Sequence, residues 1–447
     1  MVKNFKLRNI ISQLFCIILI IIFASMFWDL WNSGYRNWVF APFYEKGALL
    51  FVFEYLFIYI IFMKIYEGNK IDYLNSFDLI YSQTLSLIIS NFIIYIQMCL
   101  LTKMIVTPIP LLYMTLKQFC IIIVWAVLSK KIYSASFPPL KMLVINGNAS
   151  TENLIKKMNK HTDKYIISNM VESSVGIEKI IKSIDKHDAV IISDVESQLR
   201  NEILKYCFSK SVRTYITPKI SDIIISNSEK LHILDTPLLI IKNGGIAYYQ
   251  RIIKRLMDLL LSFLALIIAS PFMLIVAILI KLCDSGSIIY KQKRLTINNK
   301  EFYLYKFRSM YEDAEKDGKA VLARENDDRI TPIGRIIRKI RFDELPQLIN
   351  IFKGDMSIVG PRPERPEITE KYMEDMPEFS FRTKVKAGLT GYAQVIGKYN
   401  TTAHDKLKLD LMYIENYSLM LDFKLMIMTV KILFKSESTE GVVEKAN

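Results

Sequence analysis

Four long apolar runs lie in the first 133 residues, and they constrain the fold more than any other feature. They cover about residues 10–31, 47–66, 77–102 and 106–129. Each approaches the roughly 20 residues that a helix needs to cross a bilayer. Helices of a soluble bundle keep a polar face, whereas residues 15–27 are apolar apart from Ser25. The sequence therefore predicts four transmembrane helices within residues 1–135.

Basic residues around these runs indicate how the helices are oriented. Short loops that are rich in Lys and Arg stay on the cytoplasmic side of a membrane. Both ends of this region are basic, which agrees with an even number of crossings, so we expect the rest of the chain to be cytoplasmic. The residues concerned are Lys3, Lys6 and Arg8 before the first run, Lys64 and Lys70 between the second and third, and Lys130, Lys131 and Lys141 after the fourth.

The whole chain is apolar and basic, which narrows the classes of function. Its 447 residues allow two to four domains, 51% of them are hydrophobic, and the formal charge is +14. This combination suits anionic lipid headgroups and anionic substrates. Nucleic acid would also suit the charge, but no nucleic-acid-binding module is recognisable, so we expect none to bind. Five scattered cysteines without a C-x-x-C pair indicate neither a disulfide framework nor a zinc site.

Residues 140–245 show a different pattern, in which short apolar strands alternate with amphipathic stretches. Strands are expected at residues 142–145, 165–167 and 189–192, and helices at 152–159 and 177–184. This alternation is typical of βαβ units and a small parallel sheet. A dinucleotide site would need G-x-G-x-x-G after the first strand, but residues 146–150 contain only Gly147. We therefore expect a degenerate Rossmann-like module with a regulatory or oligomeric role.

A fifth apolar run covers residues 256–280, and three features argue against a straight crossing. Ser270 and Pro271 interrupt the run near its centre, where proline kinks a helix. Asp258 lies inside the run, and a charge is costly at full membrane depth. Both flanks are basic, so both ends favour the cytoplasm. A re-entrant helix that enters one leaflet and returns satisfies all three conditions; a straight fifth span is the alternative.

Basic residues cluster in the region that follows. Residues 305–310 (YKFRSM) alternate charged and apolar side chains, as in a strand or turn with one cationic face. A basic helix is expected over residues 333–341. Such cations can hold a diphosphate and offset the charge of a phosphoryl-transfer transition state. The candidate phosphate-binding residues are Lys306, Arg308, Arg329, Arg335, Arg338 and Arg362.

The adjacent carboxylates of Asp343 and Glu344 are the best-placed acidic group in the chain. Pro346 is well placed to begin a helix, so the pair lies at or just before a helix N-terminus, where the dipole favours the ionised form. An ionised aspartate can attack phosphorus to give an acyl phosphate. A neighbouring glutamate can ligate Mg²⁺, which prefers a few carboxylates together with phosphate oxygens. Arg362 stands between two prolines, whose stiff backbone suits a fixed aim at a phosphate.

Residues 254–434 resemble the bacterial sugar transferase family, the monotopic phosphoglycosyl transferases. The resemblance rests on residues 341–347 (RFDELPQ), 359–364 (VGPRPE) and 386–391 (KAGLTG), and on the Ser-Pro break in the fifth run. Large members of the family also carry four spans and a Rossmann-like module ahead of the catalytic domain. The chain departs from the family at Ala387, where proline is more common, and at residues 341–342, where Ser or Thr followed by Leu is common.

The resemblance implies a specific reaction. It is the transfer of a sugar-1-phosphate from a UDP-sugar to undecaprenyl (polyprenyl) phosphate, with release of UMP, at the start of exopolysaccharide, capsule or O-antigen assembly. The resemblance assigns Asp343 as the nucleophile, through a covalent aspartyl-phosphosugar intermediate, and Glu344 as the ligand of Mg²⁺.

The resemblance also implies a layout for the molecule. The protein is expected to be a multi-pass protein of the bacterial inner membrane, in contact with membrane lipid, with its catalytic domain on the cytoplasmic face. That domain is expected to be an α-rich α+β fold over residues 250–435, followed by a tail at 436–447. A homodimer is compatible with this layout.

Two other classes of protein are kept as alternatives. A membrane-bound nucleotide-sugar dehydratase would also combine four spans with a Rossmann-like sheet, but it needs an intact glycine fingerprint and a Tyr-x-x-x-Lys pair. A non-enzymatic scaffold for polysaccharide assembly would tolerate loss of Asp343, Glu344 and the arginines, which are all present. No motif marks the sugar, so galactose, glucose and an N-acetylated hexosamine all fit.

Overall fold

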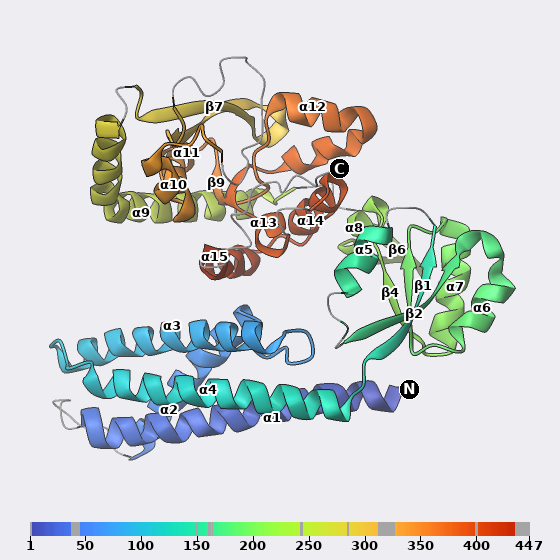
Figure 1. Ribbon diagram of the computed structural model, residues 1–447, viewed down its shortest axis with the longest axis horizontal. Coiled ribbons are helices and arrows are strands. Elements are labelled where there is room, and N and C mark those ends of the chain that lie inside the picture. Colours follow the sequence, from blue (N-terminus) through green and yellow to red (C-terminus); the bar gives the residue numbers. More distant parts are fainter. Residues whose placement is uncertain are drawn as a thin grey trace. The chain divides into compact units, whose positions relative to one another are not determined.

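The computed structural model divides into two compact units, Met1–Thr217 and Pro218–Asn447, and each is described by itself (Figure 1). The residues that the structure describes are 2–36, 45–147, 151–159, 162, 164–241, 245–283, 286–311, 327–397 and 401–433. The predicted tail at 436–447 lies outside this set.

Four long helices open the first unit. They are α1 (Val2–Leu30), which continues into a π-helical turn at Trp31–Tyr35, α2 (Glu45–Ile65), α3 (Ser76–Thr102) and α4 (Ile109–Ser136). Each is long and apolar enough to cross a membrane, as the sequence predicts. Aromatic side chains fill the space between them; the rings of Phe27 and Tyr55, for example, stack with centroids 4.4 Å apart.

Polar side chains of this bundle point inward. Gln118 donates a hydrogen bond to the hydroxyl of Tyr55 at 2.8 Å, and Asn91 donates to Gln118 at 3.1 Å. Such hydrogen bonds between helices satisfy polar groups that hydrocarbon could not. The outward-facing side chains are apolar and exposed, among them Phe53 and Phe92. An apolar outer surface, with the polar groups hydrogen-bonded inside, suits a helix bundle in lipid.

A parallel sheet follows the bundle within the first unit. Its strands are β1 (Leu140–Asn146), β2 (Tyr165–Glu172), β3 (Ala189–Ser193) and β4 (Arg213–Ile216), in the order β2-β1-β3-β4. Its helices are α5 (Thr151–Met158), α6 (Ile177–Ile184) and α7 (Ser197–Ser209), with a short 3-10 turn at Ser173–Val175. The small parallel sheet predicted from the alternating pattern is therefore confirmed.

Gly147 has a packing role at the end of β1. A Cβ atom at this position would lie 1.9 Å from the carbonyl oxygen of Asp194, so only glycine allows the two backbones to approach. The remaining residues of the incomplete fingerprint, 148–150, lie outside the described residues. A degenerate Rossmann-like module stays a prediction.

In its described residues, the second unit combines helices with three small sheets. Its helices are α8 (Ile220–Ser226), α9 (Tyr248–Cys283), α10 (Pro332–Lys339), α11 (Gln347–Lys353), α12 (Pro366–Asp375), α13 (Tyr392–Ile396), α14 (Ala403–Glu415) and α15 (Leu419–Leu433). Its 3-10 segments are Ile297–Asn299, Phe342–Glu344 and Pro377–Lys384. Its strands are β5 (Glu229–Ile233), β6 (Thr236–Ile240), β7 (Ile289–Leu295), β8 (Glu301–Phe307), β9 (Ser357–Val359) and β10 (Gly388–Thr390).

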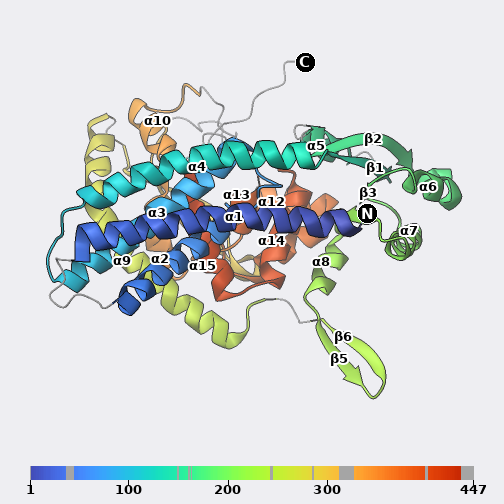
Figure 2. The ribbon, with the colours of Figure 1, turned by 90° about the horizontal axis from the view of Figure 1, so that it is seen from below.

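These strands pair in three ways. β5 and β6 form an exposed antiparallel hairpin that stands apart from the other elements of its unit (Figure 2). β7 and β8 form a second antiparallel pair, whereas β9 and β10 are parallel. A Cβ atom on Gly388 would lie 2.1 Å from the backbone nitrogen of Gly360. The backbone of the 386–391 segment therefore lies directly against the 359–364 segment.

Helix α9 is continuous through Pro271 and bends sharply along its length (Figure 1). One face packs on the body of the second unit on both sides of the proline. Ala265, Leu266 and Ala269 contact the cluster around Ile351, whereas the part after Pro271 contacts a second cluster that includes Phe307 and Ile337. The opposite face is apolar and exposed, and by length and composition α9 is a fifth helix able to cross a membrane.

Two polar groups within the apolar part of α9 have partners in the protein. Pro271 has no N–H to donate to the carbonyl of Ile267, and the hydroxyl of Ser270 donates to that oxygen instead, at 2.8 Å. Asp258, which the sequence marks as costly inside an apolar run, is 5% exposed and accepts a hydrogen bond from the backbone of Ile358 at 3.0 Å. The charge therefore faces the packed side of the helix.

Candidate active site

Helix α10 packs tightly beside the strand that supplies the first candidate cation. Thr331 caps the helix by accepting a hydrogen bond from the Gly334 amide at 2.9 Å. A Cβ atom on Gly334 would lie 2.0 Å from the carbonyl oxygen of Ser309, so the helix lies directly on the backbone that follows β8. Lys306 of β8 and Arg338 of α10 are thereby brought to one region of the unit.

The acidic pair lies in a 3-10 turn, Phe342–Glu344, between α10 and α11. Arg341 enters this turn with a φ of 56°, in the left-handed region. A non-glycine residue there costs about 1 kcal/mol or more and is held by the surrounding structure. Helix α11 then begins at Gln347 with Pro346 before it, close to the helix start predicted from the proline. Asp343 and Glu344 thus precede α11 by one turn.

Helix α11 is also tied to α9. Arg255 donates to the carbonyl oxygens of Ile351 at 2.7 Å and Phe352 at 2.8 Å, which caps the last turn of α11 with a cation. Asn350 of α11 accepts a hydrogen bond from the backbone amide of Tyr305 at 2.9 Å. The turn that carries the carboxylates is therefore anchored through α11 to both the long apolar helix and β8.

Two cations converge on one oxygen of Glu344. Lys306 Nζ lies 2.9 Å from Glu344 Oε1, and Arg362 Nη2 lies 3.2 Å from the same atom. Burial alone would raise the pKa of Glu344, but Lys306 and Arg362 outweigh burial and hold that pKa well below its usual range. The charge of Glu344 in turn raises the pKa of Arg362. This carboxylate is therefore ionised at every physiological pH.

Asp343 has a different environment from its neighbour. Burial raises the pKa of its carboxyl, and the charges of Lys306, Arg338 and Arg362 oppose that rise. Among the described residues, none donates a hydrogen bond to this carboxylate. Asp343 is thus a half-buried carboxylate surrounded by cations, and its oxygens have no hydrogen-bond donor within the described part of the chain.

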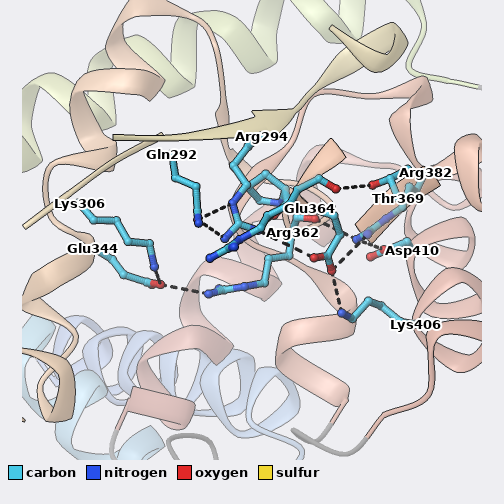
Figure 3. A network of polar contacts seen from close by, with 12 residues as sticks. Gln292, Arg294, Lys306, Glu344, Arg362, Glu364, Thr369, Arg382, Lys406 and Asp410 are labelled. Atoms are coloured by element: carbon cyan, nitrogen blue, oxygen red, sulfur yellow. Dashed lines mark hydrogen bonds and ion pairs between the residues drawn. The ribbon is translucent and has the colours of Figure 1, made fainter. Parts of the chain in front are cut away.

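A buried network of polar contacts holds the backbone of Arg362 (Figure 3). Arg382 donates to the carbonyl oxygen of Arg362 at 2.9 Å, and Arg294 donates to that of Pro363 at 3.0 Å. Arg382 also binds the carboxylate of Asp410 at 2.7 Å, where both side chains are almost fully buried. The stiff segment that the two prolines predict is therefore fixed by arginines from two other elements.

Glu364 lies at the centre of the same network. Lys406 Nζ lies 2.8 Å from its carboxylate, Arg382 Nη1 lies 3.4 Å away and Arg294 Nη1 lies 3.9 Å away (Figure 3). Burial would raise the pKa of Glu364, but these three cations hold it below its usual value. Glu364 therefore stays ionised around neutral pH.

The remaining candidate cations, Arg308, Arg329 and Arg335, make no contact with Asp343 or Glu344 that the described residues show. Arg308 is buried just beyond β8. Arg329 forms a two-bond ion pair with Asp327, at 2.6 and 2.8 Å. Arg335 is exposed on α10. A phosphate-binding role for these three arginines stays a prediction, whereas Lys306, Arg338 and Arg362 lie around the carboxylates.

The residues present fit a magnesium ion that is shared with a substrate. The described part of the chain contains no group of three or more His, Cys, Asp and Glu that could hold a metal alone. Mg²⁺, however, is commonly bound by one or two carboxylates together with substrate phosphates. Glu344 is held in its ionised form, and the contacts of Lys306 and Arg362 involve one of its two oxygens. Glu312 and Asp313, expected to be ordinary surface carboxylates, lie outside the described residues.

Sequence reasoning missed the supporting residues of this site. Arg382 and Asp410 carry no motif, although a carboxylate within the apolar stripe of α14 is a signal for a buried partner. Lys254 likewise pairs with Asp422 of α15, and Tyr413 donates to that carboxylate at 2.7 Å. These groups connect α9, α14 and α15, and the Tyr413 hydroxyl also lies 3.2 Å from the carbonyl oxygen of Val359 in β9.

Comparison with known proteins bears on the segment that builds this site. The family described as "Bacterial sugar transferase" matches residues 249–436. A putative undecaprenyl-phosphate N-acetylgalactosaminyl 1-phosphate transferase of Bacillus subtilis (strain 168) is 52% identical over 130 residues, which are 29% of this chain and 72% of that protein. The chain belongs to the bacterial sugar transferase family.

Two longer relatives match more of the chain. The UDP-N-acetylgalactosamine-undecaprenyl-phosphate N-acetylgalactosaminephosphotransferase of Aeromonas hydrophila is 35% identical over 254 residues, 56% of this chain and 59% of that protein. The UDP-glucose:undecaprenyl-phosphate glucose-1-phosphate transferase of Klebsiella pneumoniae is 33% identical over 265 residues, 57% of this chain and 54% of that protein. The chain therefore spans little more than half the length of these two sugar transferases, which differ in the sugar that their names give.

Proposed function

We propose that this sugar transferase moves a sugar-1-phosphate from a UDP-sugar to undecaprenyl phosphate and releases UMP. The observation that supports this most directly is the carboxylate of Asp343, uncommitted among the described residues and surrounded by Lys306, Arg338 and Arg362. It lies within the segment that the family matches. Such a reaction would start the assembly of an exopolysaccharide, a capsule or an O-antigen.

The first step is attack by a carboxylate oxygen of Asp343 on the phosphorus that carries the sugar. The new O–P bond forms as the bond from that phosphorus to the UMP oxygen breaks, and UMP leaves with the electron pair. Lys306 and Arg362 are placed to offset the charge that develops on the phosphate oxygens. The result is an aspartyl-phosphosugar.

In the second step, a phosphate oxygen of undecaprenyl phosphate attacks the same phosphorus. The bond to Asp343 breaks, so the aspartate returns to its ionised form and the product is a polyprenyl diphosphate sugar. The network of Arg382, Glu364 and Asp410 keeps the Arg362 backbone in one position during both steps.

Glu344 is proposed to hold Mg²⁺ through the oxygen that Lys306 and Arg362 leave uncontacted. When bound, the ion offsets negative charge on the diphosphate. The depressed pKa of Glu344 keeps this ligand ionised without competition from protons.

The fold supports a shallow membrane position for α9. The helix has 36 residues and would be about 54 Å long if straight, well beyond the ~30 Å hydrocarbon core. Both of its halves pack on the same body, and the outer face is apolar along its length. A re-entrant α9, with the catalytic domain on the cytoplasmic face of the inner membrane, agrees with these features. A homodimer stays a prediction.

The nucleophile is tested with the purified full chain and a panel of UDP-sugars. Without an acceptor lipid, the wild type should release one UMP per enzyme and retain the sugar phosphate covalently, because the first step is independent of the second. Asp343→Asn should do neither. Asp375→Asn, which alters an exposed carboxylate of α12, is the matched control and should behave as the wild type. Near-normal transfer by Asp343→Asn would show that the nucleophile is wrongly assigned.

The topology is tested by labelling single cysteines in a cysteine-free background. One replaces Ser228, before α9, and the other replaces Ser436, which lies outside the described residues. An impermeant reagent applied to intact spheroplasts should label neither. Labelling of one and not the other would mean that α9 crosses the membrane.

A further inference from the structure

A cavity of about 40 Å³ lies within the first unit, where the helix bundle meets the parallel sheet. The bundle contributes the start of α1, the loop between α2 and α3, and the end of α4. The sheet contributes the first residues of β1, β2 and β4, which are Leu140, Tyr165 and Arg213. A dinucleotide would bind at the opposite, carboxyl edge of such a sheet, so this cavity is separate from the incomplete fingerprint at Gly147.

The cavity is lined mainly by cations and aromatic rings. Among the described residues, the lining has four cations, Arg8, Lys130, Lys164 and Arg213, and one carboxylate, that of Asp72. The described lining therefore has a formal surplus of three positive charges. An anion that enters this space is attracted by all four cations.

Several contacts hold these cations in place. The guanidinium of Arg8 lies 5.1 Å from the ring of Phe137 and donates to the carbonyl oxygen of Pro138 at 3.0 Å. Arg213 lies 5.0 Å from the ring of Tyr215. Lys164 donates to the carbonyl oxygen of Tyr73, across from the sheet to the bundle. The charges are thus oriented by aromatic faces and backbone oxygens from both parts of the unit.

The size and position of the cavity limit which ligands it can bind. A single water needs about 10 to 15 Å³ by the same measure, so the cavity accepts about three waters, or the terminal oxygens of one phosphate group. It lies where α1 and α4 leave the region expected to be in the membrane, beside the exposed apolar residues Leu7, Ile10 and Ile132. Headgroups of anionic lipids occupy that level of a membrane.

We propose that this junction cavity binds a phosphate group, and that an anionic membrane lipid is the source that its position favours. A bound headgroup would contact cations from α1, α4 and β4 and from Lys164, just before β2, and so fasten the sheet to the bundle. A soluble phosphate compound has the same chemistry and is the second source to be tested.

The experiment uses the purified full chain in a neutral detergent. Its melting temperature is followed on titration with short-chain phosphatidic acid, short-chain phosphatidylcholine or inorganic phosphate, and native mass spectrometry counts the retained lipid. Phosphatidic acid should raise the melting temperature of the wild type, whereas phosphatidylcholine should not. Because each cation near a headgroup contributes about 5-fold in affinity, the double variant Lys164→Gln/Arg213→Gln should bind phosphatidic acid about 30-fold more weakly.

Matched variants separate a built site from general surface charge. Lys182→Gln/Lys205→Gln removes two exposed cations from α6 and α7 and should leave the affinity unchanged, and Arg213→Lys should retain most of it. Arg8→Gln, with an expected 5-fold loss, replaces the double variant if that protein does not fold. Stabilisation by inorganic phosphate alone, with the same dependence on Lys164 and Arg213, would assign a soluble ligand. Equal loss in both double variants, or no response to either phosphate source, would overturn the proposal.

Discussion

Arg382→Met should loosen the segment that carries Arg362, because it removes the central cation of a buried network. The side chain of Arg382 is 4% exposed and that of Asp410 is 1% exposed. Glu364 keeps Lys406 and Arg294 as partners after the substitution. Asp410 loses its hydrogen-bond donor, since Arg382 is the one donor to its carboxylate among the described residues.

The loss of local stability in Arg382→Met follows from the buried carboxylate of Asp410 that is left without its cation. Removing one partner of a buried ion pair costs about 3 to 5 kcal/mol, mostly because the other charge is left without compensation. A cost of about 3 kcal/mol corresponds to more than 100-fold in the equilibrium between closed and locally open states. We therefore expect the amide hydrogen-exchange rates of α14 and of residues 359–364 to rise more than 100-fold. Transfer should also suffer, because the Arg362 carbonyl loses its donor.

Peptide-resolved hydrogen exchange on the full chain is the appropriate assay. The four tryptophans, at positions 28, 31, 38 and 125, all belong to the first unit, so their fluorescence would not report on this network. Lys371→Met, on the exposed side of α12, is the control and should leave exchange unchanged. Adding Asp410→Asn to Arg382→Met should recover part of the loss, because no unpaired charge remains. Exchange in Arg382→Met within about threefold of the wild type would refute this account, since a 3 kcal/mol cost requires far more.

Further expectations concern the metal, the pH profile and the bent helix. Glu344→Gln should raise the Mg²⁺ concentration needed for transfer, whereas Glu374→Gln, on the exposed face of α12, should not; full activity of the wild type in excess EDTA would contradict the metal site. The nucleophile must be ionised, and burial raises the pKa of Asp343. As the pH is lowered, activity should therefore be lost at a higher pH than if the nucleophile were an exposed aspartate. Loss of activity only within or below the ordinary pKa range of aspartate would contradict this. Pro271→Ala should straighten α9 and lower transfer although the residue contacts no substrate, and Ser270→Ala should lower it less; wild-type transfer rates for Pro271→Ala would count against a role for the bend.

The elements that follow from composition were the ones that the sequence could predict. A membrane helix is a property of about 20 consecutive residues and needs no partner, so the four long helices and α9 were visible in the chain. Three strands of the parallel sheet, β1, β2 and β3, were visible for a similar reason, whereas β4 was not predicted. β2 extends to Glu172, well beyond the predicted 165–167. Its later residues are largely exposed, so no apolar run marks them.

Which side chains contact each other in the candidate site could not be predicted in the same way. Lys306 and Glu344 are 38 positions apart, and only the packing of β8 against the 3-10 turn brings them together. Arg335 and Arg338 share a helix face by spacing, yet Arg338 acts on Asp343 while Arg335 is exposed. Arg329 was the foreseeable exception, since Asp327 stands two residues before it and captures its guanidinium.

The bend of α9 restricts how the second unit can turn. A straight helix inserted in an apolar layer leaves the attached body free to spin about the helix axis. Two arms that are not collinear define a plane (Figure 1), and both arms carry exposed apolar side chains. Rotation about either arm would lift the other out of the apolar layer, at a cost that grows with each apolar side chain exposed to water. If α9 lies in the membrane surface as proposed, this bent helix would fix the tilt and the azimuth of the second unit relative to the layer, and the proposed nucleophile Asp343 would meet a lipid-borne phosphate from one constant direction.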